Sequence, residues 1–451
     1  MSPRQFAERL VRQLRQAGHV AYWAGGCVRD ELLGLIPKDY DIATSARPEE
    51  VRRVLRNYRT LAVGQAFGVV VVVGPPGAGN VDVATFRREA DYSDGRRPDR
   101  VSFFSSPEED AQRRDFTING LFYDPIEKRV IDYVGGQRDL EQRIIRAIGD
   151  AHERIAEDKL RMLRAIRLAT VYNFEIDEDC WQAIRQHAPE ISQVSVERVT
   201  EELRLIFRHP ARARGADLLA RSGLLAVILP EGQPVFGWSD SAQPSAAWAR
   251  TLDVLEKLGR QPDAVLGWAA LLRELDSPPE QAAMQAVVIG RRWRLAIREL
   301  ELIERAIRCA PLLAGAHQQP WPKIQRLLAQ PSAGRLVEFT EALVRAGGQT
   351  AEGVEFCRKV LQMPEQEWNP PPLITGSHLK ELGLRPGPIY KEILERVRDA
   401  QLEKRISTTG EALALAQQLI QHLQHAEQGR CKNAHAPPDA NQQSKRQENN
   451  Q

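Results

Sequence analysis

Short apolar runs broken by turn residues fill the N-terminal third of the chain. Residues 69–73 are five valines, and residues 81–86 alternate between apolar and polar side chains, as strands do. Glycine clusters at 25–26, 74–79 and 135–136 interrupt these runs, and such clusters are typical of turns. The pattern therefore predicts a mixed β-sheet with helices in this part of the chain.

From about residue 140 onward, apolar residues recur every three or four positions, as at Leu160, Leu163 and Ile166. This spacing predicts helices. After about residue 426 the chain is rich in Gln, Asn, Lys and Pro and almost lacks large apolar side chains, so we expect a disordered tail. The predicted fold class is α+β, with a small N-terminal mixed β-sheet domain followed by an all-helical remainder.

Charge and composition narrow the class of protein. The 451 residues include 62 Lys and Arg and 60 Asp and Glu, a net charge of +2. This excludes a chain that is basic throughout but not local basic surfaces. No apolar run approaches the ~20 residues that cross a bilayer, and the N-terminus lacks a signal-peptide pattern. Five separated cysteines without a Cys-x-x-Cys pair indicate neither disulfides nor zinc. We expect a cytoplasmic protein without membrane contact.

Two carboxylates stand at alternate positions, Asp39 and Asp41. On a strand this spacing directs both to one face, where their charges repel unless a cation lies between them. Mg²⁺ takes carboxylate and phosphate oxygens, and such a pair suits nucleotidyl transfer. An isolated Asp-x-Asp is more often a solvated turn, so its context must decide.

The glycine pair Gly25-Gly26 lies between an apolar segment and a predicted helix that carries Arg29 in its first turn. Glycines at such a turn let backbone N–H groups approach phosphates, and arginine binds phosphate oxygens as a fork. Asp30 is expected to orient Arg29 or to cap the helix. A glycine pair alone is most often an ordinary turn. Because Arg29 and the two carboxylates follow within a short stretch of sequence, a phosphate-binding turn is favoured here.

A second glycine segment, 74–80, has the frame of a phosphate-binding P-loop but carries Asn80 and Val81 in place of the required Lys and Ser or Thr. We predict a hairpin loop there. Asp82 on the following strand is a candidate third carboxylate beside Asp39 and Asp41.

Two further groups of charged residues fit a nucleotide. Arg114, in the triplet 113–115, suits a triphosphate, although such a triplet is more often a surface ion-pair cluster. Asp158 and Arg161 are three residues apart and share a face of a predicted helix. A carboxylate beside a guanidinium can accept from the amine of cytosine or adenine and donate to the neighbouring ring nitrogen. On spacing alone, a helical salt-bridge face is the more common explanation.

These segments together resemble the class II tRNA nucleotidyltransferases and bacterial poly(A) polymerases of the DNA polymerase β superfamily. The resemblance lies in residues 25–44, 81–89, 113–120, 133–140 and 157–169, with a weaker likeness at 373–388. It implies catalytic, metal-binding carboxylates at Asp39 and Asp41 with Mg²⁺ as cofactor. It also implies nucleotide contacts at Gly26, Arg29, Arg114, Asp158, Arg161, Arg164 and Arg167.

The same resemblance implies a domain order: nucleotidyltransferase head 1–140, base-recognising neck 141–205, body 206–310 and tRNA-binding tail 311–425. The disordered end predicted from composition, 426–451, follows them. It implies addition of CCA from CTP and ATP to the 3′ end of tRNA. The alternatives are poly(A) polymerase or an A-adding enzyme and, from another class, a noncatalytic RNA-binding protein. Segment 89–100 resembles a loop associated with A addition, and segment 64–69 is closer to the CCA-adding side.

Arginines also cluster outside these motifs. The two clusters are Arg198, Arg204, Arg208, Arg212 and Arg214, and Arg291, Arg292, Arg294 and Arg298. If they face one side, they form a salt-sensitive track for RNA phosphates. Pairing with nearby glutamates on solvated helices is an equally good explanation. The oligomeric state is not indicated by the sequence.

Overall fold

The computed structural model describes residues 1–61, 68–90, 100–103, 106–238, 245–259, 261, 263–384 and 387–433. Two compact units make up the chain. The first comprises residues 1–308 and 345–348, and the second comprises residues 309–344 and the chain from 349 onward. Segments 64–67 and 91–99, on which the expected choice between CCA and other additions rests, lie outside the described residues.

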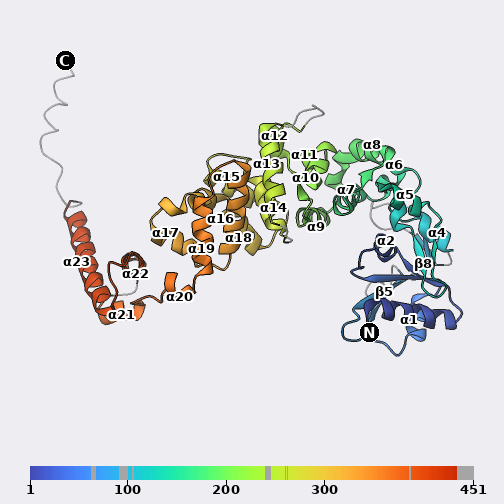
Figure 1. The fold of residues 1–451 in the computed structure, drawn as a ribbon, viewed down its shortest axis with the longest axis horizontal. Coiled ribbons are helices and arrows are strands. Elements are labelled where there is room, and N and C mark those ends of the chain that lie inside the picture. Colours follow the sequence, from blue (N-terminus) through green and yellow to red (C-terminus); the bar gives the residue numbers. More distant parts are fainter. Residues whose placement is uncertain are drawn as a thin grey trace, which may run out of the picture. The chain divides into compact units, whose positions relative to one another are not determined.

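The first unit begins with a mixed seven-stranded sheet in the order β3-β4-β5-β2-β1-β8-β9 (Figure 1). Its elements are α1 (Pro3–Gln16), β1 (Ala21–Ala24), α2 (Gly26–Leu32), β2 (Tyr40–Thr44), α3 (Pro48–Val54), β3 (Thr60–Leu61), β4 (Val69–Val73), β5 (Asn80–Thr85), α4 (Pro107–Gln112), the 3₁₀ turn η2 (Thr117–Asn119), β8 (Phe122–Asp124), β9 (Arg129–Ile131) and α5 (Gly136–Gln142). Strands β6 (Arg87–Ala90) and β7 (Arg100–Phe103) form a separate antiparallel pair. The mixed sheet predicted for residues 1–140 is confirmed.

The pairing of β2 explains why this sheet is mixed. It runs antiparallel to β1 and parallel to β5, whereas β4 and β5 form an antiparallel hairpin. The connection 74–79 between β4 and β5 is thus the predicted hairpin loop. Trp23 of β1 is fully buried and packs against the rings of Tyr40 and Tyr123. The apolar side chains of the central strands therefore hold the sheet, and the polar ends of β2 and β5 remain at its edge.

Helices follow the sheet in the first unit: α6 (Ala151–Glu157), α7 (Arg161–Tyr172), α8 (Glu178–His187), α9 (Val196–Phe207), α10 (Arg212–Arg221), α11 (Leu224–Ile228), α12 (Gln233–Phe236), α13 (Ala246–Lys257), α14 (Ala264–Leu272) and α15 (Pro279–Arg292). Helix α16 (Ile297–Ala314) begins in the first unit and ends in the second. The predicted periodicity is confirmed in α7, whose Leu163 and Ile166 are fully buried. This part of the chain, predicted to be all helical, also contains two short parallel strands, β10 (Ile144–Ile145) and β11 (Glu175–Ile176), which pair with each other.

The second unit is helical in its described part. It contains α17 (Trp321–Leu328), α18 (Ala333–Ala346), α19 (Glu352–Gln362), α20 (Glu365–Trp368), α21 (Gly376–Glu381), α22 (Pro388–Leu402) and α23 (Thr409–Asn433). Leu379, Ile393 and Val397 form the centre of a small core between α21, α22 and α23.

The C-terminal end differs from the prediction. We expected disorder from residue 426, but α23 continues to Asn433. This stretch includes Ala, Gln and Glu, which have high helix propensity, a local property that disorder prediction from low hydrophobicity does not weigh. Residues 434–451 lie outside the described residues. Within the described part of the chain, no helix is long and apolar enough to cross a membrane.

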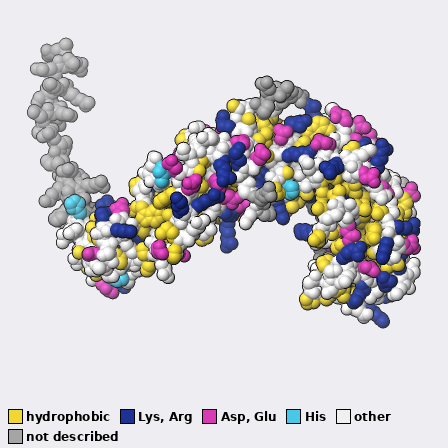
Figure 2. All heavy atoms as spheres, in the orientation of Figure 1, with side chains coloured by type: hydrophobic (Ala, Val, Ile, Leu, Met, Phe, Trp, Pro, Cys, Tyr) yellow, Lys and Arg dark blue, Asp and Glu magenta, His cyan; other side chains and the backbone are white. Residues whose placement is uncertain are grey.

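Charges of both signs are interspersed on the visible surface of the helices (Figure 2). This matches the near balance of the 62 basic and 60 acidic residues. The balance of charge on this face comes from mixing at short range, so a functional charge must be sought in local clusters.

Candidate active site

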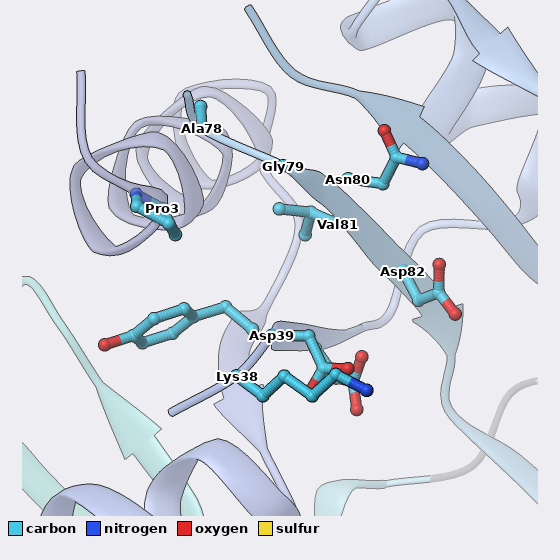
Figure 3. A pocket seen from close by; sticks show the side chains of 10 residues that line it. Pro3, Lys38, Asp39, Ala78, Gly79, Asn80, Val81 and Asp82 are labelled. Carbon is cyan, nitrogen blue, oxygen red and sulfur yellow. The ribbon is translucent and has the colours of Figure 1, made fainter. Parts of the chain in front are cut away.

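Three carboxylates gather at the polar edge of the head sheet. Asp41 is on β2, Asp39 directly precedes that strand, and Asp82 is the residue of β5 that lies opposite Asp41 in the parallel register. All three line a hollow of about 290 Å³. Figure 3 shows Asp39 and Asp82 extending their carboxylates to the same side of this hollow. The structure thus places the predicted pair together and adds Asp82 beside it.

The charges of these groups oppose one another. Withdrawal of water by the surrounding protein, together with repulsion from Asp39 and Asp82, raises the pKa of Asp41 to about 6, and the charge of Arg114 opposes this rise. Desolvation and the charge of Asp39 also raise the pKa of Asp82. Asp41 nevertheless keeps access to solvent. A cation entering this hollow would relieve the repulsion.

The donor set suits a divalent metal that brings further ligands with it. Among the described residues, no three His, Cys, Asp or Glu side chains are grouped as a complete metal site. Mg²⁺ is commonly held by one or two carboxylates, and substrate phosphates and water complete its coordination. Asp39 and Asp41 fit this mode of binding, with Asp82 alongside.

The turn at Gly25 and Gly26 lies against two arginines. Gly25 has a φ of +75°, and a Cβ there would lie 2.8 Å from Nη1 of Arg114. A Cβ at Gly26 would lie 3.5 Å from Nη2 of Arg29. Gly25 is therefore needed for the close approach of Arg114, whereas the distance at Gly26 is an ordinary contact. The predicted phosphate contacts Gly26, Arg29 and Arg114 lie together at the start of α2.

Asn119 bridges these two arginines. Its side-chain oxygen accepts from Nη1 of Arg29 at 2.5 Å, and its backbone oxygen accepts from Nη1 of Arg114 at 3.2 Å. Arg114 also pairs with buried Asp110 at 3.1 Å, and Arg29 pairs with Asp30 at 2.8 Å. The ion pair between Asp30 and Arg29 supports the predicted role of Asp30 in orienting Arg29.

The network continues to helix α7. The side-chain amide of Asn119 donates to Asp115 at 3.0 Å, and Asp115 pairs with Arg164 at 2.6 Å. Burial opposes the charged form of Asp115, but Arg164, Asn119 and the N–H of Phe116 outweigh it and lower the pKa of Asp115 well below its usual range. The head sheet and the neck helix are thus joined by a continuous chain of charged hydrogen bonds.

Arg167, the next predicted contact on α7, pairs with Glu202 of α9 at 3.0 Å. Burial lowers the pKa of Arg167, and the charges of Arg164 and Arg29 lower it further, while Glu202 opposes them. Positive charge is therefore concentrated where α7 faces the head, and Glu202 balances part of it.

The prediction for Asp158 needs a correction. We expected it on one helix with Arg161, but Asp158 follows the end of α6 in an extended conformation, with φ −146°, and α7 begins only at Arg161. The carboxylate of Asp158 accepts from the N–H of Leu160 at 3.1 Å, a local bond that competes with helix formation. The two residues thus flank a break between helices instead of sharing a face.

Both residues already have partners. Asp158 pairs with Arg198 of α9 at 2.8 Å, and Arg161 pairs with Glu157 at 2.5 Å. The sequence motif did not reveal Arg198, because 40 residues separate it from Asp158. Asp115 and Asn119 lie inside segment 113–120, which carries part of the family resemblance, but their bridging role depends on contacts made only in the folded chain.

The arginine clusters divide between structural and exposed positions. Arg204 pairs with Glu299, while Arg214 donates to the backbone carbonyls of Ala169, in the last turn of α7, and of Phe174, just beyond that helix. Arg208 and Arg298 are exposed. The expected phosphate track therefore cannot use all of these arginines without breaking internal contacts.

Comparison with known proteins adds independent evidence. The family model of the poly A polymerase head domain matches residues 21–146, and that of a probable RNA- and SrmB-binding site of polymerase A matches residues 173–235. The CCA-adding enzyme of Geobacillus sp. (strain WCH70) is 32% identical over 419 residues, covering 91% of this chain and 96% of the relative. That of Geobacillus kaustophilus (strain HTA426) is 40% identical over 287 residues, 60% of this chain and 70% of the relative.

A solved structure agrees with these sequence relatives. The crystal structure of the Bacillus stearothermophilus CCA-adding enzyme in complex with CTP is 29% identical, with a TM-score of 0.69, and the match covers 95% of this chain and 100% of that chain. The likeness extends through both compact units. The chain belongs to the CCA-adding enzyme family and is a nucleotidyltransferase.

Proposed function

We propose that this protein adds C and A residues from CTP and ATP to the 3′ end of tRNA, completing the CCA sequence. The observation that carries the proposal is the carboxylate pair Asp39 and Asp41 within reach of the charge of Arg114, in a chain related over 91% of its length to a CCA-adding enzyme. A cytoplasmic location is part of the same proposal.

In the proposed reaction the 3′-hydroxyl oxygen of the tRNA attacks the α-phosphorus of the nucleoside triphosphate. A bond from that oxygen to phosphorus forms, the bond from phosphorus to the bridging oxygen breaks, pyrophosphate leaves with its electron pair, and the hydroxyl proton passes to water. Mg²⁺, when bound, lowers the pKa of the attacking hydroxyl and neutralises charge on the phosphates. Asp39 and Asp41 hold the metal site, and Asp82 keeps a third negative charge beside them.

The arginines orient the triphosphate in this proposal. Arg29 and Arg114 lie at the Gly25-Gly26 turn, and Asn119 holds both of them. A guanidinium group remains charged at all physiological pH values and donates two hydrogen bonds to neighbouring oxygens. Binding the phosphates there directs the α-phosphate toward Asp39 and Asp41, because Arg114 also lies close enough to Asp41 for its charge to oppose the rise in the pKa of that carboxyl.

The base is selected by Asp158 and Arg161, with Arg164 and Arg167 as further contacts. Asp158 accepts from the exocyclic amine that cytosine and adenine share, and uracil and guanine present an oxygen there. In the structure Arg198 and Glu157 hold these two side chains. Residues 141–205 then serve as the neck, and the body (206–310) and the tail (311–425) hold the tRNA.

An incorporation assay tests the proposal. Purified protein is incubated with tRNA transcripts that end before the CCA sequence, after its first C or after its second C, with one labelled nucleotide at a time and Mg²⁺. We expect C on the first two transcripts and A on the third. Long A tails on unrelated RNA would indicate a poly(A) polymerase, and tRNA binding without incorporation would indicate a noncatalytic protein. Activity that survives Asp39→Ala with Asp41→Ala would reject the metal site.

A further inference from the structure

The last residue of helix α7, Tyr172, contacts the helix that carries Arg29. The phenol ring of Tyr172 lies over the Arg29 guanidinium, with 4.4 Å from Cζ to the ring centroid. Its hydroxyl donates to Oδ1 of Asp30 at 2.8 Å. The same carboxylate oxygen accepts from Nε of Arg29 at 2.9 Å. One tyrosine thus contacts both members of the Arg29–Asp30 pair.

Three partners fix the Arg29 side chain, which is only 10% exposed. Asp30 holds Nε and Nη2, Asn119 holds Nη1, and Tyr172 covers one face of the planar group. The second hydrogens of Nη1 and Nη2 remain to donate to phosphate oxygens, because each terminal nitrogen carries two. The side chain therefore loses its conformational freedom on folding, before any ligand arrives, and this lowers the entropy cost of binding.

The hydroxyl of Tyr172 stays a donor at neutral pH. Burial raises the pKa of Tyr172 to about 12, and the hydrogen bond to Asp30 adds to this rise, while the charge of Arg29 opposes it. The ring face and the hydroxyl therefore act together on the pair, since the ring attracts the cation and the hydroxyl fixes the anion.

We propose that Tyr172 is a positioning residue that holds Arg29 in place to bind the phosphates of the nucleoside triphosphate. This inference rests on the proposed function. In the proposed function Arg161 and Arg164, near the other end of α7, contact the base or its surroundings, so this helix would serve both ends of the nucleotide. The role of Tyr172 concerns the phosphates that CTP and ATP share. It is therefore the same for both nucleotides.

Steady-state kinetics with CTP and ATP on the matching tRNA transcripts test this role. Tyr172→Leu removes the ring and the hydroxyl, and we expect the KM for both nucleotides to rise by about tenfold and by similar factors. Tyr172→Phe keeps the ring and loses only the hydroxyl, so we expect a rise of about two- to threefold. The preference for C over U should stay unchanged, because Asp158 and Arg161 are intact.

The control is Tyr58→Leu, which removes a ring that packs on Phe6 in the head. It should lower the unfolding temperature while leaving both KM values unchanged. If Tyr172→Leu behaves like this control, the tyrosine is merely structural and the proposal is overturned. A KM change confined to CTP or to ATP overturns it too, since the shared phosphates would not be the cause. If Tyr172→Leu does not fold, Tyr172→Phe supplies the same comparison.

Binding of inorganic tripolyphosphate, measured by calorimetry on the full chain, separates this inference from the proposed function. We expect wild type to bind it and Tyr172→Leu to bind about tenfold more weakly. A wild-type protein that transfers no nucleotide but shows this difference would refute the proposed function and support the role of Tyr172. An active wild type whose tripolyphosphate affinity equals that of Tyr172→Leu would refute the role of Tyr172 alone.

Discussion

The carboxylates at the sheet edge and the arginines between the head and α7 differ in how their charges are balanced. Asp39, Asp41 and Asp82 face one another, and their mutual repulsion helps to raise the pKa of Asp41. Arg29 and Arg164, in contrast, each have a carboxylate partner, and Asn119 and Asp115 join them. One region therefore concentrates unbalanced charge, and the other holds its charges in a fixed network.

The difference shows two ways in which a fold prepares for a charged ligand. Repulsion between unbalanced carboxylates lowers the free energy of unfolding. A bound cation removes this repulsion and restores the lost stability. Paired arginines cost little to keep in place, and their position is set in advance. Substitutions should therefore have opposite effects on stability in the two regions, although both lower activity.

The largest effect is expected from Asp41→Asn. We expect the rate of nucleotide incorporation to fall by roughly three orders of magnitude, because one ligand of the proposed metal is lost. The same variant should be more stable than wild type in EDTA at pH 8, by about 1 kcal/mol after screening by solvent. Incorporation kinetics and thermal unfolding measure the two effects.

The sign of the stability effect follows from the raised pKa of Asp41, about 6. The folded protein binds this proton more tightly than the unfolded chain does, so the stabilising contribution is present at low pH and is lost as the pH rises through about 6. Asp41→Asn cannot undergo this loss, and its advantage should vanish near pH 4. A variant less stable than wild type at pH 8 would contradict the unbalanced charge.

Asp115→Asn should have the opposite effect on stability. It leaves Arg164 without its carboxylate partner, and we expect a loss of about 3 kcal/mol in the free energy of unfolding at pH 7. Because the pKa of Asp115 is lowered, its contribution is present above the ordinary carboxyl pKa and fades as the pH falls below it, so the loss should shrink toward pH 3. Urea unfolding at several pH values measures this.

The control for Asp115→Asn is Asp253→Asn, which breaks an ion pair with Lys257 on the surface of α13. Such a pair contributes little, so unfolding should change by less than about 0.5 kcal/mol. Equal losses in the two variants would show that the buried network adds nothing beyond an ordinary ion pair.

The sequence predicted the head sheet and the residues of the carboxylate pair, because both follow from local pattern. Alternation identified the strands, and the spacing of Asp39 and Asp41 on or next to one strand fixed their common side. The position of Asp82 was a candidate only, since its closeness to Asp41 depends on the parallel pairing of β2 with β5. Strand pairing is not a local property.

The hydrogen-bond network around the arginines could be predicted from the sequence only in part. Asp158 looked helical because its neighbours have helical periodicity, but its bond to the N–H of Leu160 favours a break. Arg198 and Tyr172 lie in other segments from Asp158 and Arg29, and no spacing rule connects them. Long-range ion pairs of this kind become visible only when the chain is folded.

Base selection tests a smaller effect in the paired region. Asp158→Ala should lower the preference for C and A over U and G by about 10- to 100-fold, the discrimination that one good base contact supplies. Transfer of some nucleotide should remain, because the carboxylate edge and Arg29 are untouched. Competition between labelled CTP and UTP on one transcript measures the ratio. An unchanged ratio would reject the role of Asp158 in base recognition.

The smallest expected effect is on the salt dependence of tRNA binding. It distinguishes an exposed arginine outside the site from one that is hydrogen-bonded within the protein. Arg208 is exposed, whereas Arg214 donates to the carbonyls of Ala169 and Phe174. If Arg208 contacts an RNA phosphate, Arg208→Ala should reduce the slope of log affinity for tRNA against log salt by about 0.7 to 0.9, because one fewer counterion is released. Arg214→Ala should lower the unfolding temperature without changing the slope, since its donors are already used. Filter binding from low to high salt distinguishes the two. A slope that changes only in Arg214→Ala would mean that this arginine exchanges its internal carbonyl partners for RNA, and the division between fixed and available charges would then fail outside the active site.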